Sequence, residues 1–154
     1  MRFRTTSPAG LLFWTGQNTS ASAPSDFLAL GFTDGVLQFR YNLGGGEVVI
    51  SYNGSNLVDG QWHSIRAQRD KQDGYLEVDH RWIVEGSSPG KFSVLNTNKE
   101  LYLGGALDTS LLTFGKFLTG FTGCISDVKL AEEYNINLVK GAHSGRNIQS
   151  CDIT

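Results

Sequence analysis

Residues 26–43 have the sequence DFLALGFTDGVLQFRYNL, which predicts two β-strands joined by a tight turn. The turn is Asp34-Gly35, a dipeptide that favours a two-residue hairpin loop. After the turn, Leu37, Phe39 and Tyr41 alternate with other residues and therefore share one face of a strand. The stretch predicts an antiparallel hairpin.

The same pattern recurs along the whole chain, with short apolar or alternating segments separated by turn residues. Roughly a dozen short strands at this spacing predict an all-β fold, a sandwich of two antiparallel sheets. We find no internal repeat or linker and interpret residues 1–154 as a single domain. Only residues 130–139 could hold a short helical turn. The other predicted strands are 2–5, 10–14, 47–52, 61–67, 75–79, 81–84, 100–103 and 123–130.

The composition agrees with this interpretation and excludes other classes. The chain has 154 residues, 19 glycines and only 3 prolines, which suits a β-protein with many tight turns. Its longest apolar run is far shorter than a membrane-spanning helix requires, so we expect no membrane insertion. The formal net charge of −2 does not favour nucleic-acid binding.

The first residues lack the pattern of a signal peptide, since residues 1–5 alternate like a strand. The chain is then either cytosolic or a domain of a larger secreted protein, and we favour the second. Asn18 and Asn53 each begin a triplet that fits the acceptor pattern for N-glycosylation. We therefore predict possible glycosylation of both asparagines.

The two cysteines, Cys124 and Cys151, allow one intrachain pairing. The alternative is two unrelated thiols, and Cys124 lies in an apolar run where a free thiol would be ordinary. Cys151 lies in a polar stretch, where a bonded cysteine is the better explanation. We predict a disulfide.

Five motifs follow one another along the chain: residues 7–14 (SPAGLLFW), 26–44, 59–63 (DGQWH), 101–105 (LYLGG) and 121–125 (FTGCI). Together they resemble the laminin G-like domain, also called the LNS domain. The resemblance covers essentially the whole chain, with the second cysteine near its end. It implies a jelly-roll, concanavalin-like sandwich and a secreted binding module of the extracellular matrix or cell surface, with laminin G-like or EGF-like neighbours.

The resemblance also implies one calcium ion at the rim of the sandwich. Matched to the family's pattern, its ligands are the carboxylate of Asp26, the carbonyls of Leu43 and Val94, and the side-chain oxygen of Asn96. These are oxygen donors of the types that calcium prefers, and one carboxylate suits a low affinity, about 10⁻⁴–10⁻³ M. The alternative interpretation, from the residues alone, is that Asp26 is a loop carboxylate and Asn96 is a turn residue.

An incomplete coordination shell implies that a partner's acidic group completes it. By resemblance, that partner is the acidic glycan of α-dystroglycan or a cell-surface receptor. Basic residues near the rim could assist the ion, and the candidates are Arg40, Arg66, Arg69 and Lys71.

Two other classes of function are weaker alternatives. One is a structural spacer or a calcium-independent protein-binding domain. The other is a sandwich glycosidase, since Glu77 and Asp79 would share one face of a strand. The third acidic position of the known glycosidase strand is Arg81 here, so we expect no enzyme.

Overall fold

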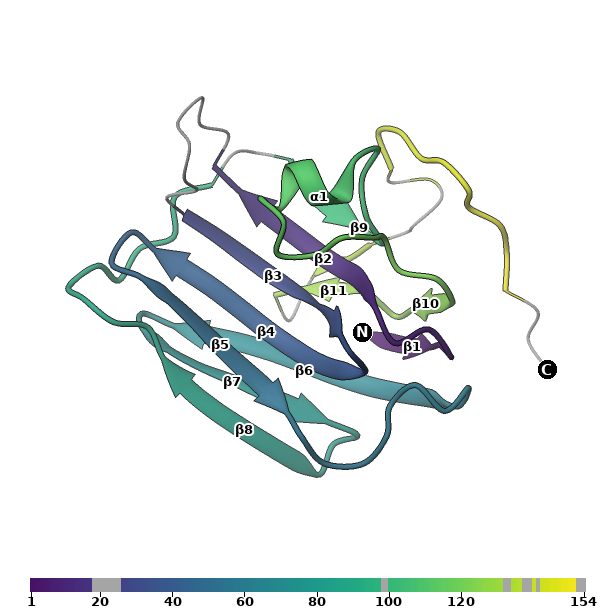
Figure 1. The fold of residues 1–154 in the computed structure, drawn as a ribbon, viewed down its shortest axis with the longest axis horizontal. Coiled ribbons are helices and arrows are strands. Elements are labelled where there is room, and N and C mark those ends of the chain that lie inside the picture. The colour runs from purple at the N-terminus through teal and green to yellow at the C-terminus, as the bar shows by residue number, and fades with distance from the viewer. Residues whose placement is uncertain (18–25, 98–99, 132–133, 137–139, 141, 152–154) are drawn as a thin grey trace.

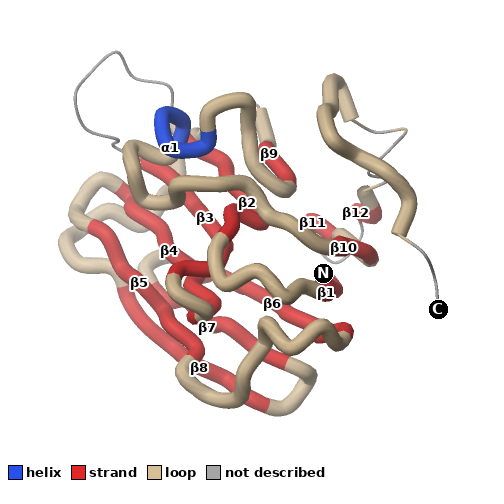
Figure 2. Tube along the Cα trace, turned by 45° about the vertical axis from the view of Figure 1, so that its right-hand side comes forward, coloured by secondary structure: helices blue, strands red, loops and turns tan. Residues whose placement is uncertain are grey.

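The computed structural model describes residues 1–17, 26–97, 100–131, 134–136, 140 and 142–151. These residues form twelve strands and one short helix, and two five-stranded antiparallel sheets face each other (Figures 1 and 2). The predicted all-β class and two-sheet sandwich are therefore confirmed. The described residues contain no helix long and apolar enough to cross a membrane.

Each sheet combines strands that are far apart in the sequence. One sheet has the order β10 (Cys124–Ser126), β1 (Arg2–Arg4), β6 (Trp62–Asp70), β7 (Asp73–Val78) and β8 (Trp82–Ser87). The other has the order β5 (Glu47–Tyr52), β4 (Val36–Leu43), β3 (Asp26–Thr33), β2 (Gly10–Gly16) and β9 (Tyr102–Leu103). A separate small pair joins β11 (Lys129–Leu130) to β12 (Tyr134–Asn135).

The hairpin predicted for residues 26–43 is present as β3 and β4. Its register runs from Thr33 opposite Val36 at the turn to Asp26 opposite Leu43 at the open end. The turn residues Asp34 and Gly35 have φ values of 50° and 78°, as a two-residue hairpin loop requires. This geometry explains the Asp-Gly dipeptide.

The core between the two sheets is built from the alternating apolar side chains. Leu37, Phe39 and Tyr41 are buried in it, as predicted. Phe3 of the facing sheet packs edge-on against Phe32, with ring centroids 5.3 Å apart. Burial of these apolar side chains between the sheets stabilises the sandwich.

The helix is not where the sequence allowed one. α1 (Thr109–Leu112) is capped by Asp108, whose carboxylate accepts a hydrogen bond from the Leu111 amide at 3.0 Å. Four helical residues are too few to show a 3.6-residue period, so the pattern gave no signal. Of the candidate turn at 130–139, the described part contains strand β12 instead.

The predicted strand at 123–130 is interrupted. Asp127 has a φ of 52°, a left-handed conformation that ends β10 before β11 begins. Asp tolerates this conformation better than most residues, which is why an alternating pattern here did not form one continuous strand.

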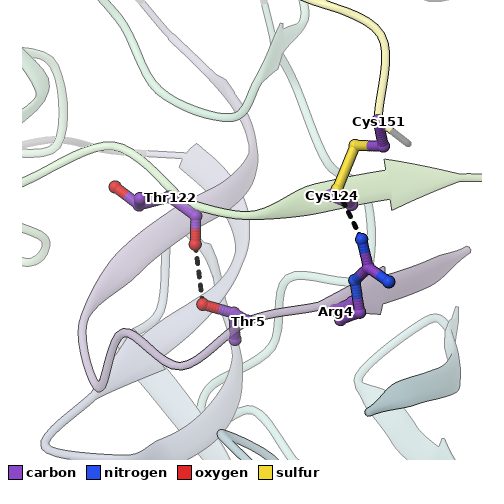
Figure 3. The surroundings of a disulfide bond; sticks show 5 residues. All are labelled: Arg4, Thr5, Thr122, Cys124 and Cys151. Atoms are coloured by element: carbon purple, nitrogen blue, oxygen red, sulfur yellow. Dashed lines mark hydrogen bonds between the residues drawn. A yellow bond between two sulfur atoms is a disulfide. The ribbon is translucent and has the colours of Figure 1, made fainter. Parts of the chain in front are cut away.

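A disulfide joins Cys124 on β10 to Cys151, whose Cα atoms are 6.0 Å apart (Figure 3). The Arg4 guanidinium donates to Cys124 Sγ at 3.7 Å, and the Thr5 hydroxyl donates to the Thr122 carbonyl at 2.6 Å. The bond therefore ties the C-terminal segment to the β1–β10 pair. Asn53 is exposed after β5, whereas Asn18 lies outside the described residues.

Candidate metal centre

The open end of the β3–β4 hairpin forms the candidate site. Asp26 begins β3 and lies directly opposite Leu43, the last residue of β4. The carboxylate-bearing residue is only 5% exposed, although it lies at the rim of the sandwich. Two of the four predicted ligands are therefore brought together by strand pairing alone.

A third predicted ligand arrives from a distant segment. The backbone amide of Asn96 donates a hydrogen bond to Asp26 Oδ2 at 2.8 Å across 70 positions of sequence. Val94 lies two residues earlier in the same segment and is 62% exposed. The structure thus brings Asp26, Leu43 and the backbone of Asn96 together, and Val94 lies two residues from Asn96 in the same segment.

Glycines allow these segments to approach. A Cβ atom at Gly45 would lie 2.7 Å from the Pro89 carbonyl oxygen, so only glycine fits there without movement of backbone. At Gly44, a Cβ would lie 3.5 Å from both Asp26 Oδ1 and the Phe92 ring. The run of three glycines at 44–46 therefore packs against residues 89–92, a contact that no local sequence pattern predicts.

Among the basic candidates, Arg69 is placed beside the site. Its guanidinium donates to the carbonyls of Lys71 at 2.6 Å and Ser93 at 3.2 Å, which holds the 91–97 segment against the β6–β7 turn. Arg40 instead forms an ion pair with Glu47, which also accepts from Lys116 Nζ at 2.6 Å. The charge of Arg40 is therefore balanced by Glu47 and is not directed at the site.

The Asp26 carboxylate fits a cation-binding role. Within the described parts of the chain it accepts one hydrogen bond, on Oδ2, and no lysine, arginine or histidine nitrogen lies within ion-pair distance. A buried carboxylate without a cation costs free energy, which a bound ion would offset. The described residues contain no cluster of three or more acidic, histidine or cysteine ligands. Any ion here therefore relies on carbonyl and amide oxygens besides Asp26.

A second polar cluster surrounds His63 on β6. Its Nδ1 lies 2.8 Å from Asp79 Oδ2 and its Nε2 lies 2.9 Å from Asp59 Oδ1. Burial lowers the pKa of His63, but the two carboxylates outweigh it and leave the pKa above its ordinary value of 6.5. Hydrogen bonds from the Gln61 amide and from His63 lower the pKa of Asp59. The imidazolium form therefore bridges two carboxylates.

This bridge predicts pH-dependent stability. Because the folded-state pKa of His63 is raised, its contribution is fully present below about pH 6.5 and is lost as the pH rises through the folded pKa. We expect the melting temperature of the parent to exceed that of His63→Gln most at roughly pH 5.5 and least at roughly pH 9. Thermal melts of both proteins across this range test the expectation, and a pH-independent difference would contradict it.

The glycosidase alternative finds no support in the geometry. Asp79 accepts hydrogen bonds from the Ser64 amide at 2.9 Å and from His63, so it is a structural residue of the β7–β8 turn. Glu77 lies opposite Arg66 on the outer face of the sheet. The two carboxylates of the hypothetical pair therefore belong to different environments.

The fold is the two-sheet antiparallel sandwich that the resemblance implied. The model of the Laminin G domain family matches residues 3–133, and the chain belongs to this family. This membership confirms the resemblance and the expected non-enzymatic class, and the matrix proteins among the relatives support the extracellular location.

The relatives are much longer than this chain. The chain is 44% identical over 151 residues to pikachurin of Rattus norvegicus, a match that covers 98% of the chain but 15% of pikachurin. It is 40% identical to the basement membrane-specific heparan sulfate proteoglycan core protein of Mus musculus, covering 96% of the chain and 4% of that protein. The LG1-3 region of the laminin alpha2 chain has the same fold, with a TM-score of 0.74 at 23% identity, covering 88% of the chain and 26% of that structure.

Proposed function

We propose that this domain is a calcium-dependent extracellular binding module that recognises an acidic group on its partner. One Ca²⁺ would be held by the Asp26 carboxylate, the carbonyls of Leu43 and Val94, and the side chain of Asn96. The observation that supports this most is the buried Asp26 carboxylate, which no cation of the described residues balances.

The ion would leave coordination positions open. Calcium takes six to eight oxygens, so four protein ligands leave about two to four for water or a partner. A uronic-acid carboxylate would suit such a position. Exposed Phe92 and Val94 lie on the same segment as Asn96, and their apolar surface would contact the rest of the partner.

The partner that we propose is the acidic glycan of α-dystroglycan or a receptor with a similar acidic group. A single ion contact is weak, so repeated glycan units or neighbouring laminin G-like or EGF-like domains in the parent protein would raise the affinity. We also propose N-glycans at Asn18 and Asn53. Exposed Asn53 lies after β5, which leaves room for a glycan outside the rim segments.

The test is surface binding to glycosylated α-dystroglycan with calcium, with magnesium alone and with a chelator. We expect binding with calcium only, because magnesium demands a tighter octahedral shell and retains its waters. De-glycosylated α-dystroglycan serves as the control partner. Binding that is equal with calcium and with chelator would contradict the proposed mechanism.

Calcium-independent protein binding is the second candidate. It is favoured by exposed apolar side chains on and around α1, since contiguous apolar surface often marks a protein interface. In the binding assay it would give a signal that persists in chelator and on de-glycosylated partner. The side chains concerned are Leu107, Leu111, Phe114 and Leu118.

A further inference from the structure

Strand β8 is an unusually apolar edge strand. It is the last strand of its sheet and pairs only with β7, and it lies at the margin of the sandwich in both views (Figures 1 and 2). Edge strands normally avoid association by being short or by carrying lysine or proline. β9 and β10 are two and three residues long, but β8 has six residues, with Trp82 48% and Ile83 57% exposed.

The backbone of β8 has groups free for a further strand. The Ser88 amide donates to the Gln72 carbonyl at 2.9 Å, which marks that pair as hydrogen-bonded. In an antiparallel ladder, hydrogen-bonded and non-hydrogen-bonded pairs alternate. Counting back from Ser88, the amides and carbonyls of Ile83 and Glu85 therefore point away from β7, toward the open edge.

The side chains of β8 are self-complementary. Ile83 and Glu85 are two residues apart on β8 and therefore share its outer face. Arg81 immediately precedes the strand, so the two charged residues lie at equal distances along the chain on either side of Ile83. Among the described residues neither charge has an ion-pair partner, and the Arg81 guanidinium lies over the Trp82 ring, 4.8 Å from its centroid. β5, the other six-residue edge, contains Glu47 but no basic residue.

We propose that two copies of this domain pair antiparallel along β8, about a two-fold axis at Ile83. In this register Arg81 of each copy lies opposite Glu85 of the other copy, and Trp82 of each copy lies opposite Val84 of the other copy. The Ile83 amides and carbonyls bond to each other, and the Glu85 amide donates to the Arg81 carbonyl. Two five-stranded sheets become one continuous sheet, and the interface is isologous, as closed dimers require.

A second copy is the occupant because opposite charges at equal distances from Ile83 match only a strand with the same pattern in reverse. Cross-strand pairs of opposite charge stabilise antiparallel strands, whereas like charges destabilise them. The dimer would also present two rims on one particle, which would strengthen binding to a repeating partner. The pairing stands independently of calcium.

Sedimentation equilibrium over a series of protein concentrations tests the dimer. We expect the mass to rise from 16.8 kDa toward twice that value. Arg81→Glu places Glu opposite Glu85 at both ends of the interface and should raise the dimer dissociation constant about tenfold or more. The double variant Arg81→Glu/Glu85→Arg should restore the dimer affinity of the parent. Lys129→Glu is the matched control, since exposed Lys129 lies on β11 outside this sheet.

Ile83→Lys places two like charges on the axis and should leave only monomer. Because the Ile83 side chain is mostly exposed, the monomer should keep its melting temperature, so loss of dimer is separable from unfolding. A monomeric parent at every concentration would overturn the proposal. So would a dimer that forms equally well in Arg81→Glu, or a double variant that fails to restore pairing.

Discussion

Gly123→Ala is expected to lower the free energy of unfolding by about 3 kcal/mol, which corresponds to a fall of about 6–12 °C in melting temperature. A Cβ atom at Gly123 would clash with the backbone carbonyl oxygen of Arg4, and the residue has a φ of 145°. Backbone cannot move aside as a flexible side chain can. The substitution would therefore force β10 away from β1, where Cys124 lies opposite Arg4.

Gly35→Ala is the matched control, because it shares a positive φ but nothing lies within 4 Å of its Cβ position. It should lose only the conformational part, about 1–2 kcal/mol. Thermal and denaturant melts of the parent and both variants give the comparison. Equal losses in the two variants would show that close packing at Gly123 is not the reason for glycine there.

The main sheet could be predicted because its signals are local. A two-residue loop at Asp34-Gly35 sets the register of the whole hairpin, and this register alone places Asp26 opposite Leu43. The helix could not be predicted in the same way, because it consists of four residues and depends on a cap at Asp108. Its position over β2 and β3 follows from tertiary packing of Phe117 and Leu112 with Trp14 and Phe27.

The candidate site was only half accessible from the sequence. The segment that contains Asn96 has no periodic pattern, so nothing local to it predicts contact with Asp26. Its place was given by resemblance to the family, and the structure supplies the physical reason: the glycines at 44–46 admit residues 89–92, and Arg69 binds Ser93. The sequence likewise could not show that Glu47 balances Arg40, because pairing depends on side-chain direction across β4 and β5.

Asp26→Asn is expected to remove the response of the domain to calcium. When calcium is present at a 10-fold to 100-fold excess over a Kd of about 10⁻⁴–10⁻³ M, it stabilises the parent by about 1.4–2.7 kcal/mol. This corresponds to a rise of about 3–11 °C in melting temperature. Asn keeps the size of the side chain and an oxygen that can accept from the Asn96 amide, so the fold should persist. It removes the only charged ligand and with it most of the attraction for the ion. Asn96→Ala should weaken the response less, because water can replace a neutral amide oxygen.

The calcium-free melting temperature separates a metal site from a structural carboxylate. If Asp26 is a buried charge that only a bound ion compensates, the calcium-free Asp26→Asn variant should be as stable as the calcium-free parent or more stable. The substitution removes an uncompensated buried charge. Asp34→Asn removes the same charge from the exposed turn at the other end of β3, roughly 25 Å away along the strand, beyond the range of unscreened attraction. It should keep the full calcium response. Thermal melts of the parent and both variants with and without calcium, supported by calorimetry, decide whether Asp26 is a metal ligand or a structural carboxylate. A calcium response in Asp26→Asn equal to that of Asp34→Asn would place the ion elsewhere.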